Sequence, residues 1–205
     1  MAIGGERRLA ESGRVSAAAA SLRSLLSGGD RRSIARSIQA RALVEEDRGR
    51  VAELAELARD SDWLVSMRAI DLLEKLAQEH PGWIQPHKSL FIGPLADSDE
   101  WEIRLQVVRA LPLLDWSPRE RKRVIEIVCR DAEHPRKFVR AWALDSLATF
   151  ACTDRSLMKV VRRGLEAFER PESKALQTRA RQIRKRIEND QDKPRRTTRQ
   201  RLRRS

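Results

Sequence analysis

The residues best suited to chemistry in this sequence are basic side chains in two short segments, 119–123 and 159–163. Apolar residues at helical spacing accompany both segments, so the basic residues would lie along helix faces. Guanidinium and ammonium groups attract phosphate and carboxylate oxygen atoms. The sequence therefore predicts a polyanion-binding stripe or, alternatively, a solvated face whose charges are offset by Glu120, Glu126, Asp131 and Glu166. The residues of the predicted stripe are Arg119, Arg121, Lys122, Arg123, Lys159, Arg162 and Arg163.

The net charge of the chain, +12, is concentrated near its C-terminal end. Residues 1–173 carry 29 Lys and Arg against 27 Asp and Glu, whereas residues 174–205 carry 13 against 3. A segment this polar buries too little apolar surface to offset its ordering entropy, so we expect residues 188–205 to form a disordered basic tail. Such a tail attracts RNA or DNA at low salt. Its predicted binding residues are Arg195, Arg196, Arg199, Arg201, Arg203 and Arg204.

The sequence gives little indication of a metal site or of a nucleophilic catalytic residue. The three histidines, His80, His87 and His134, match no metal-ligand spacing. Cys129 and Cys152 fall within or beside apolar helical pattern, which favours buried reduced thiols over a disulfide. No phosphate-binding glycine loop or nucleophile elbow occurs. We expect no metal, no cofactor and no evident small-molecule substrate, and these patterns favour a binding protein over an enzyme.

The elements that would position the basic residues repeat with a period near 37 residues. Asp60 and Asp62 frame an acidic turn, Asp97 and Asp99 frame another one 37 positions later, and a third copy begins around Glu133. A dense apolar segment follows each turn. A period in this range is typical of a solenoid, in which each unit buries its apolar face against its neighbours. We therefore predict an all-α fold, a right-handed α-solenoid of about four helical hairpins.

The predicted organisation has three parts: residues 1–29, a flexible segment with a short helix ending at Gly28 and Gly29; residues 30–187, the repeat domain; and residues 188–205, the tail. In the first hairpin, Ile34 and Ile38 fall on an apolar stripe. A long helix is predicted over 61–78, with a short partner helix beginning at Pro86. The next long helix is predicted over 100–114.

The second helix of the third hairpin has a recognisable start, because Ser117, Pro118 and Glu120 match an N-cap serine, a first-turn proline and a capping-box glutamate. The fourth hairpin has a predicted helix over 137–150 and a turn over 152–154. Its second helix buries an apolar stripe that comprises Leu157, Val160, Val161, Leu165 and Phe168. A last basic helix with Ala175, Leu176, Ala180, Ile183 and Ile187 follows Pro171.

The segment 138–147, which begins Phe-Val-Arg-Ala-Trp-Ala-Leu, resembles the first helix of a HEAT repeat, and Ile103 with Arg104 occupies the equivalent place one unit earlier. The resemblance covers about residues 30–187. It implies that Arg104 and Arg140 pair with acidic residues of neighbouring repeats. Ser66 holds this position in the preceding unit, with Arg68 nearby, so the arginine ladder is incomplete. The resemblance also implies a binding surface on the second helices.

One branch of HEAT-like proteins, the alkylpurine DNA glycosylases, is catalytic, and it supplies the alternative function. Such an enzyme needs aromatic side chains and a carboxylate around a cationic base. The chain has five tryptophans, Trp63, Trp83, Trp101, Trp116 and Trp142. Their places at helix starts, in turns and inside a helix favour packing between repeats over base binding.

The sequence thus predicts a non-catalytic macromolecular scaffold that binds a protein, a nucleic acid or both on the second-helix face. The basic tail would assist association with a polyanion. No stretch approaches the roughly 18 apolar residues of a membrane span, and the N-terminal residues lack the apolar core of a signal peptide. We therefore expect a cytoplasmic protein with no membrane partner.

Overall fold

The computed structural model describes residues 21–169 and 173–191. All regular elements in these two ranges are helical, which confirms the all-α class. The described residues fall into two compact units, which are divided between Ile127 and Val128. The predicted basic tail beyond residue 191 and the first residues of the predicted N-terminal helix lie outside the described ranges.

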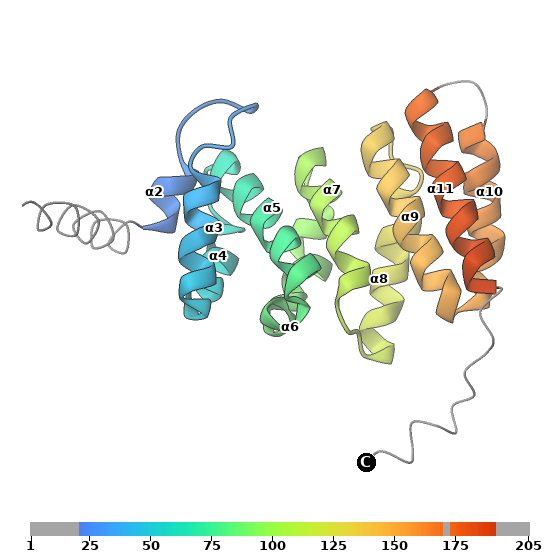
Figure 1. Ribbon diagram of the computed structural model, residues 1–205, viewed down its shortest axis with the longest axis horizontal. Coiled ribbons are helices and arrows are strands. Elements are labelled where there is room, and N and C mark those ends of the chain that lie inside the picture. Colours follow the sequence, from blue (N-terminus) through green and yellow to red (C-terminus); the bar gives the residue numbers. More distant parts are fainter. Residues whose placement is uncertain (1–20, 170–172, 192–205) are drawn as a thin grey trace, which may run out of the picture. The chain divides into compact units, whose positions relative to one another are not determined.

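The N-terminal unit is organised around one long helix, α5 (Trp63–Glu79), which contacts α4 (Val51–Leu57) and α7 (Trp101–Ala110) (Figure 1). Asp62 caps α5, because its side chain accepts a hydrogen bond from the backbone N–H of Leu64. Val65, Ala69 and Leu73 are among its buried residues. The unit also contains α2 (Leu22–Leu26), α3 (Ser37–Glu46), η1 (Arg48–Arg50), α6 (Pro81–Ile84) and the first part of α8 (Pro118–Asp131).

Prolines shorten the helices of this unit relative to the sequence prediction. The expected partner helix at Pro86 is a 3-10 helix, η2 (Gln85–Ile92), followed by a second one, η3 (Pro94–Asp97). The expected helix over 100–114 is α-helical only as far as Ala110 and ends in η4 (Leu111–Leu113). Pro112 has no N–H to donate to the carbonyl four residues earlier, so the α-helix cannot continue through it.

The apolar stripe of the first hairpin differs from the prediction, since Ile34 and Ile38 are 59% and 73% exposed. Helix α3 begins only at Ser37, and Ala40, Leu43 and Val44 are its buried apolar residues. Ile38 lies about 200° around the helix from Ala40 at 100° per residue, so it faces away from the core.

A buried arginine fixes the loop between α2 and α3. Arg68 is 2% exposed, and its guanidinium donates to the backbone carbonyls of Leu26, Gly28, Asp30 and Ser33. Gly28 has a φ of +78°, a conformation that glycine adopts without strain. Arg68 lies near the arginine position that the HEAT resemblance predicts, but this role in the loop was not predicted.

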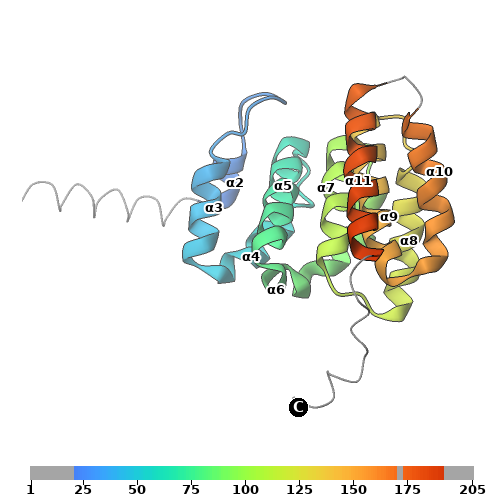
Figure 2. The same cartoon turned by 45° about the vertical axis from the view of Figure 1, so that its right-hand side comes forward.

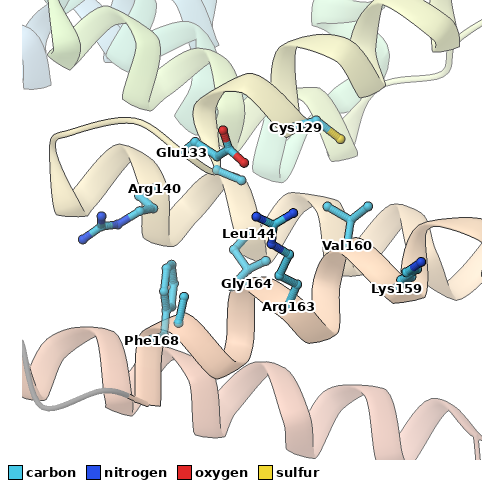
Figure 3. Close-up of a pocket in the computed structure, with 11 residues that line it drawn as sticks. Cys129, Glu133, Arg140, Leu144, Lys159, Val160, Arg163, Gly164 and Phe168 are labelled. Carbon is cyan, nitrogen blue, oxygen red and sulfur yellow. The ribbon is translucent and has the colours of Figure 1, made fainter.

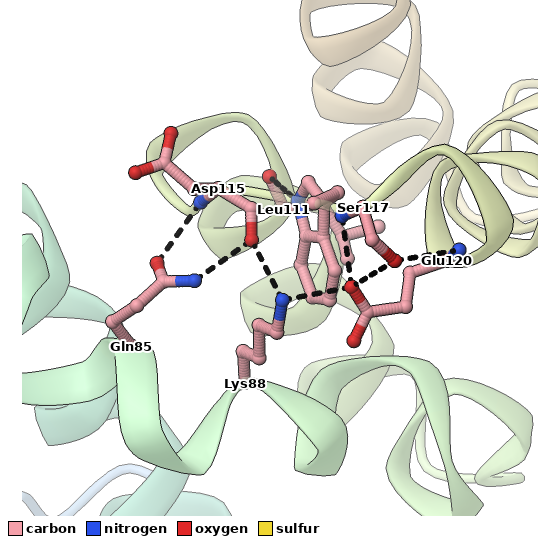
Figure 4. Close-up of polar contacts among 7 residues, drawn as sticks. Gln85, Lys88, Leu111, Asp115, Ser117 and Glu120 are labelled. Carbon is pink, nitrogen blue, oxygen red and sulfur yellow. Dashed lines mark hydrogen bonds and ion pairs between the residues drawn. The ribbon is translucent and has the colours of Figure 1, made fainter.

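The predicted capping box at the start of α8 is confirmed (Figure 4). The Ser117 Oγ accepts from the Glu120 N–H at 3.4 Å, and the Ser117 N–H donates to Glu120 Oε2 at 2.9 Å. Lys88 adds an ion pair, with its Nζ 2.7 Å from Glu120 Oε2. The hydrogen bond from Lys88, then those from Ser117, lower the pKa of Glu120 to about 2.

A polar seam joins α5 and α7 and corresponds to the pairing between repeats that the HEAT resemblance implies. Its arginine, however, is Arg109, whose Nη2 lies 3.1 Å from Glu74 Oε2. Glu74 is fully buried, and burial raises the pKa of its carboxyl group. Gln106 of α7 donates to Asp71 of α5 at 2.9 Å. These contacts hold consecutive repeats in register.

The C-terminal unit contains the end of α8, then α9 (Lys137–Thr153), η5 (Arg155–Leu157), α10 (Met158–Glu169) and α11 (Lys174–Gln191). Helices α9, α10 and α11 all contact one another, and Figures 1 and 2 show them side by side. Helix α9 continues through Thr153, so the predicted turn begins two residues later, at Asp154. Arg186 of α11 fastens the unit, because its Nη2 lies 2.9 Å from Asp145 Oδ1 on α9.

Within the described ranges, none of the helices combines the length and the apolar character that crossing a bilayer demands.

Candidate functional site

Helix α10 has a narrow buried stripe and a broad cationic face. Its buried residues are Met158, Val161, Leu165 and Phe168, spaced three or four residues apart. This spacing leaves the predicted binding residues Lys159, Arg162 and Arg163 exposed. Val160 was predicted to be buried, but it is 43% exposed. Its position is about 200° around the helix from Met158, which explains the difference.

A pocket of about 520 Å³ opens beside this face, between α9, α10 and the end of α8 (Figure 3). Its lining combines apolar groups with three cations and one carboxylate. Figure 3 shows Arg140 and Phe168 at one end, Lys159 and Val160 at the other, and Arg163 between them. The remaining lining residues are Cys129, Ala132, Glu133, Leu144, Gly164 and Ala167.

The cations of this pocket are short of partners. Lys159 and Arg163, and Arg162 beside them on α10 but outside the lining, form no ion pair with any residue in the described ranges. Arg140 is half-buried, and its Nε is buried without a hydrogen-bond acceptor among the same residues. Its guanidinium lies 5.9 Å from the centroid of the Phe168 ring. A buried donor without an acceptor is costly, so this part of Arg140 lowers the stability of the fold.

The negative and nucleophilic groups of the lining are limited to Glu133 and Cys129. Burial, followed by the nearby charge of Glu133, raises the pKa of the Cys129 thiol. Cys129 therefore remains a thiol at neutral pH and behaves as a small apolar group. The lining offers attraction and shape, with no activated nucleophile.

The predicted residues on α8 belong to the N-terminal unit. Arg119 and Lys122 are exposed, and Arg121 is half-buried. Arg123 forms an ion pair with Asp97, with its Nη2 2.8 Å from Asp97 Oδ2. Asp97 was not among the acidic residues expected to offset this face. Arg123 is thus partly neutralised, which makes α8 a poorer candidate than α10.

The remaining predicted residues, Arg195, Arg196, Arg199, Arg201, Arg203 and Arg204, lie outside the described ranges. In those ranges, no group of three or more His, Cys, Asp or Glu side chains is placed to hold a metal ion.

The tryptophans are half-buried, and none of them lines the pocket. Trp63 and Trp142 each pack against an arginine, with the guanidinium carbon of Arg31 at 4.8 Å and that of Arg179 at 3.9 Å from the ring centroid. The Trp116 indole donates to the Leu111 carbonyl at 2.7 Å. These contacts give no support to an aromatic cage for a base.

Sequence reasoning named the α10 cations and missed the pocket beside them. Arg140 was expected to pair between repeats, and Val160 was expected to be a core residue. Phe168 was also expected in the core, and it is buried there while lining the pocket. Two signals were available. Val160 lies off the helical stripe of Met158, Val161 and Leu165, and Gly164 inside a helix indicates a close approach by another element.

Comparisons with known proteins support the fold. No protein-family model matches the chain, and the search of curated proteins found no significant match. Among solved structures, an engineered protein from a structural genomics consortium has a TM-score of 0.59 at 17% identity, over 88% of this chain and 83% of that chain. A designed armadillo repeat protein in complex with the peptide (KR)4 has a TM-score of 0.56 at 18% identity, with 88% and 84% covered.

A second designed armadillo repeat protein has a TM-score of 0.53 at 17% identity, with 88% of this chain and 85% of that chain covered. At such identities the likeness shows the fold alone. It confirms an all-α solenoid of helical repeats. The armadillo-type neighbours leave the narrower HEAT assignment as a prediction.

Proposed function

We propose that this chain is a non-catalytic scaffold that binds an anionic macromolecule through the exposed cations of α10. The observation that carries the proposal is that Lys159, Arg162 and Arg163 lack an ion pair with any residue in the described ranges. Lys159 and Arg163 are four residues apart on one helix, so their like charges repel each other in the free protein. An anionic partner would relieve that repulsion.

Several other arginines in the described ranges are neutralised by carboxylates, in contrast to the three α10 cations. Arg23 lies 2.7 Å from Asp60, Arg31 lies 2.6 Å from Glu102, and Arg186 lies 2.9 Å from Asp145. These ion pairs neutralise charge within the fold. The α10 cations remain available to a partner. A local cluster of positive charges also speeds association with a negatively charged molecule.

The structural similarity to a protein in complex with a peptide supports a binding role. It does not determine whether the partner of this chain is positively or negatively charged. The peptide in that complex, (KR)4, is basic. The α10 face of this chain is itself cationic, so we infer a partner of opposite charge. A HEAT-type arrangement of the repeats, with partners on the second helices, remains part of the proposal.

We further propose that the basic residues after Gln191 add attraction to nucleic acid. Residues 193–205 contain no Asp or Glu. Their contribution would be electrostatic and independent of sequence, and it would weaken steeply with salt.

Fluorescence anisotropy with a labelled duplex of about 20 base pairs tests the proposal. The triple substitution Lys159→Gln, Arg162→Gln and Arg163→Gln should weaken binding at least tenfold. The matched control replaces three exposed cations of α11, Lys174→Gln, Arg181→Gln and Lys185→Gln, and should change affinity about twofold. If both triple variants lost affinity for the duplex to the same extent, the α10 cations would contribute only nonspecific charge. That result would overturn the proposal.

The tail is tested separately by ending the chain after Gln191, where α11 ends. The truncated protein should show a flatter dependence of log affinity on log salt. A slope that does not change would remove the tail from the proposal and leave the α10 face in place.

A further inference from the structure

Attraction to a polyanion does not account for the apolar hollow beside the α10 cations. Val160, which is 43% exposed, and Ala167, which is also exposed, supply its apolar surface above the buried Leu144 and Phe168. An exposed apolar surface within a concave site is stabilised by covering it. A polyanion that contacted only the cations would leave this surface in water.

The size of the hollow suits a side chain. Its volume of about 520 Å³ is within the range of about 300–1,000 Å³ that is usual for small-ligand sites. An entire apolar side chain and part of its backbone fit in that space.

The charges of the lining distinguish between anionic partners. Lys159, Arg163 and Arg140 line the pocket together with one carboxylate, that of Glu133. Glu133 would repel a phosphodiester backbone, which presents negative oxygen atoms. A peptide backbone offers N–H donors for Glu133. The mixture of charges therefore favours a protein segment.

We infer that this pocket binds an acidic protein segment by taking up one of its apolar side chains, while neighbouring carboxylates contact Lys159, Arg163 and Arg140. The inference rests on the proposed function and specifies its partner. The apolar side chain supplies affinity through burial, and the carboxylates supply orientation and attraction.

Two labelled peptides of about 12 residues, rich in Asp and Glu, test the inference against the full-length protein. One carries a single central Leu and the other carries Ala at that place. The Leu peptide should bind at least tenfold more tightly, because burying the larger side chain contributes that much. Equal affinities would overturn the inference.

A pocket-filling substitution provides the second arm. Ala167→Leu adds an apolar group at an exposed lining position without changing charge, and Ala175→Leu makes the same change at an exposed position on α11 that does not line the pocket. Ala167→Leu should weaken binding of the Leu peptide about tenfold and leave the affinities for the Ala peptide and the labelled duplex unchanged. Ala175→Leu should change none of them. A Leu-peptide affinity unaffected by Ala167→Leu would also overturn the inference.

The outcomes separate the inference from the proposed function. Duplex binding that depends on the α10 cations, with no preference for the Leu peptide, refutes the acidic segment and retains the scaffold. Failure of all three probes to bind at low salt refutes both. Methyl resonances of Leu144 and Val160 give a direct check, since the Leu peptide should shift them and the duplex should not.

Discussion

Gly164 of α10 lies against Leu144 of α9 so closely that a β-carbon at position 164 would be 2.5 Å from Leu144 Cδ1. Leu144 is 1% exposed, so it has little room to move. The glycine thus sets the distance between the two helices that carry Arg140 and the α10 cations. The pocket depends on this spacing, because both residues are part of its lining.

The first prediction concerns this close approach. Gly164→Ala should destabilise the protein by about 1 kcal/mol, because overpacking costs about 1–3 kcal/mol and the better helix propensity of alanine offsets about 1 kcal/mol. Adding Leu144→Val should recover part of the stability, since valine lacks the δ-methyl group that clashes. Urea unfolding of the two single variants and the double variant measures this coupling.

Gly82→Ala is the control, because nothing lies within 4 Å of the position that its β-carbon would take. It should leave stability unchanged or raise it by up to about 1 kcal/mol. A Gly164→Ala variant as stable as Gly82→Ala would show that the close approach is unimportant.

The second prediction concerns the buried guanidinium of Arg68. Arg68→Met should lower the free energy of unfolding by about 3 kcal/mol or more, because it leaves four carbonyl groups without their donor. Arg68→Lys should also destabilise, since an ammonium cannot reproduce the planar fork. Arg59→Met, which removes an exposed ion pair with Glu56, should cost less than about 1 kcal/mol. Comparable destabilisation at both positions would contradict the role assigned to Arg68.

The third prediction concerns pH and the capping box. Because the folded-state pKa of Glu120 is lowered from 4.5 to about 2, its contribution to stability is present above pH 4.5 and is lost as the pH falls toward 2. Wild type should therefore be more stable than Glu120→Gln at pH 7. Urea unfolding from pH 7 to pH 3 should show the difference shrinking below about pH 4.5. A difference that stays constant, or that grows in acid, would contradict the pKa direction.

Local sequence patterns predicted the features that depend on neighbouring residues. The capping box needed only Ser117 and Glu120 at a spacing of three, and the structure has the hydrogen bonds that this spacing allows. The repeat period predicted the helical hairpins for a similar reason, because each unit follows the same apolar pattern. The solenoid could therefore be predicted from the apolar pattern within each unit.

Features that depend on where a helix begins, or on distant residues, were not predictable in the same way. Ile38 and Val160 lie in helices, but each is on the exposed side of its helix. The apolar pattern alone placed both residues on the buried side. Arg68 bonds to carbonyls 35 to 42 positions earlier, and no local pattern encodes such an interaction. The pocket is of the same kind, since it exists only where α9 and α10 meet.

The most direct test of the central claim is the salt dependence of duplex binding by the protein that ends at Gln191, with and without the three α10 substitutions. Replacing Lys159, Arg162 and Arg163 should lower the log–log slope by about 0.9 for each phosphate that the protein no longer neutralises. The account predicts a reduction of about two to three units, and almost none for the three substitutions on α11. A slope unchanged by the α10 substitutions would contradict the claim that this face binds anionic macromolecules.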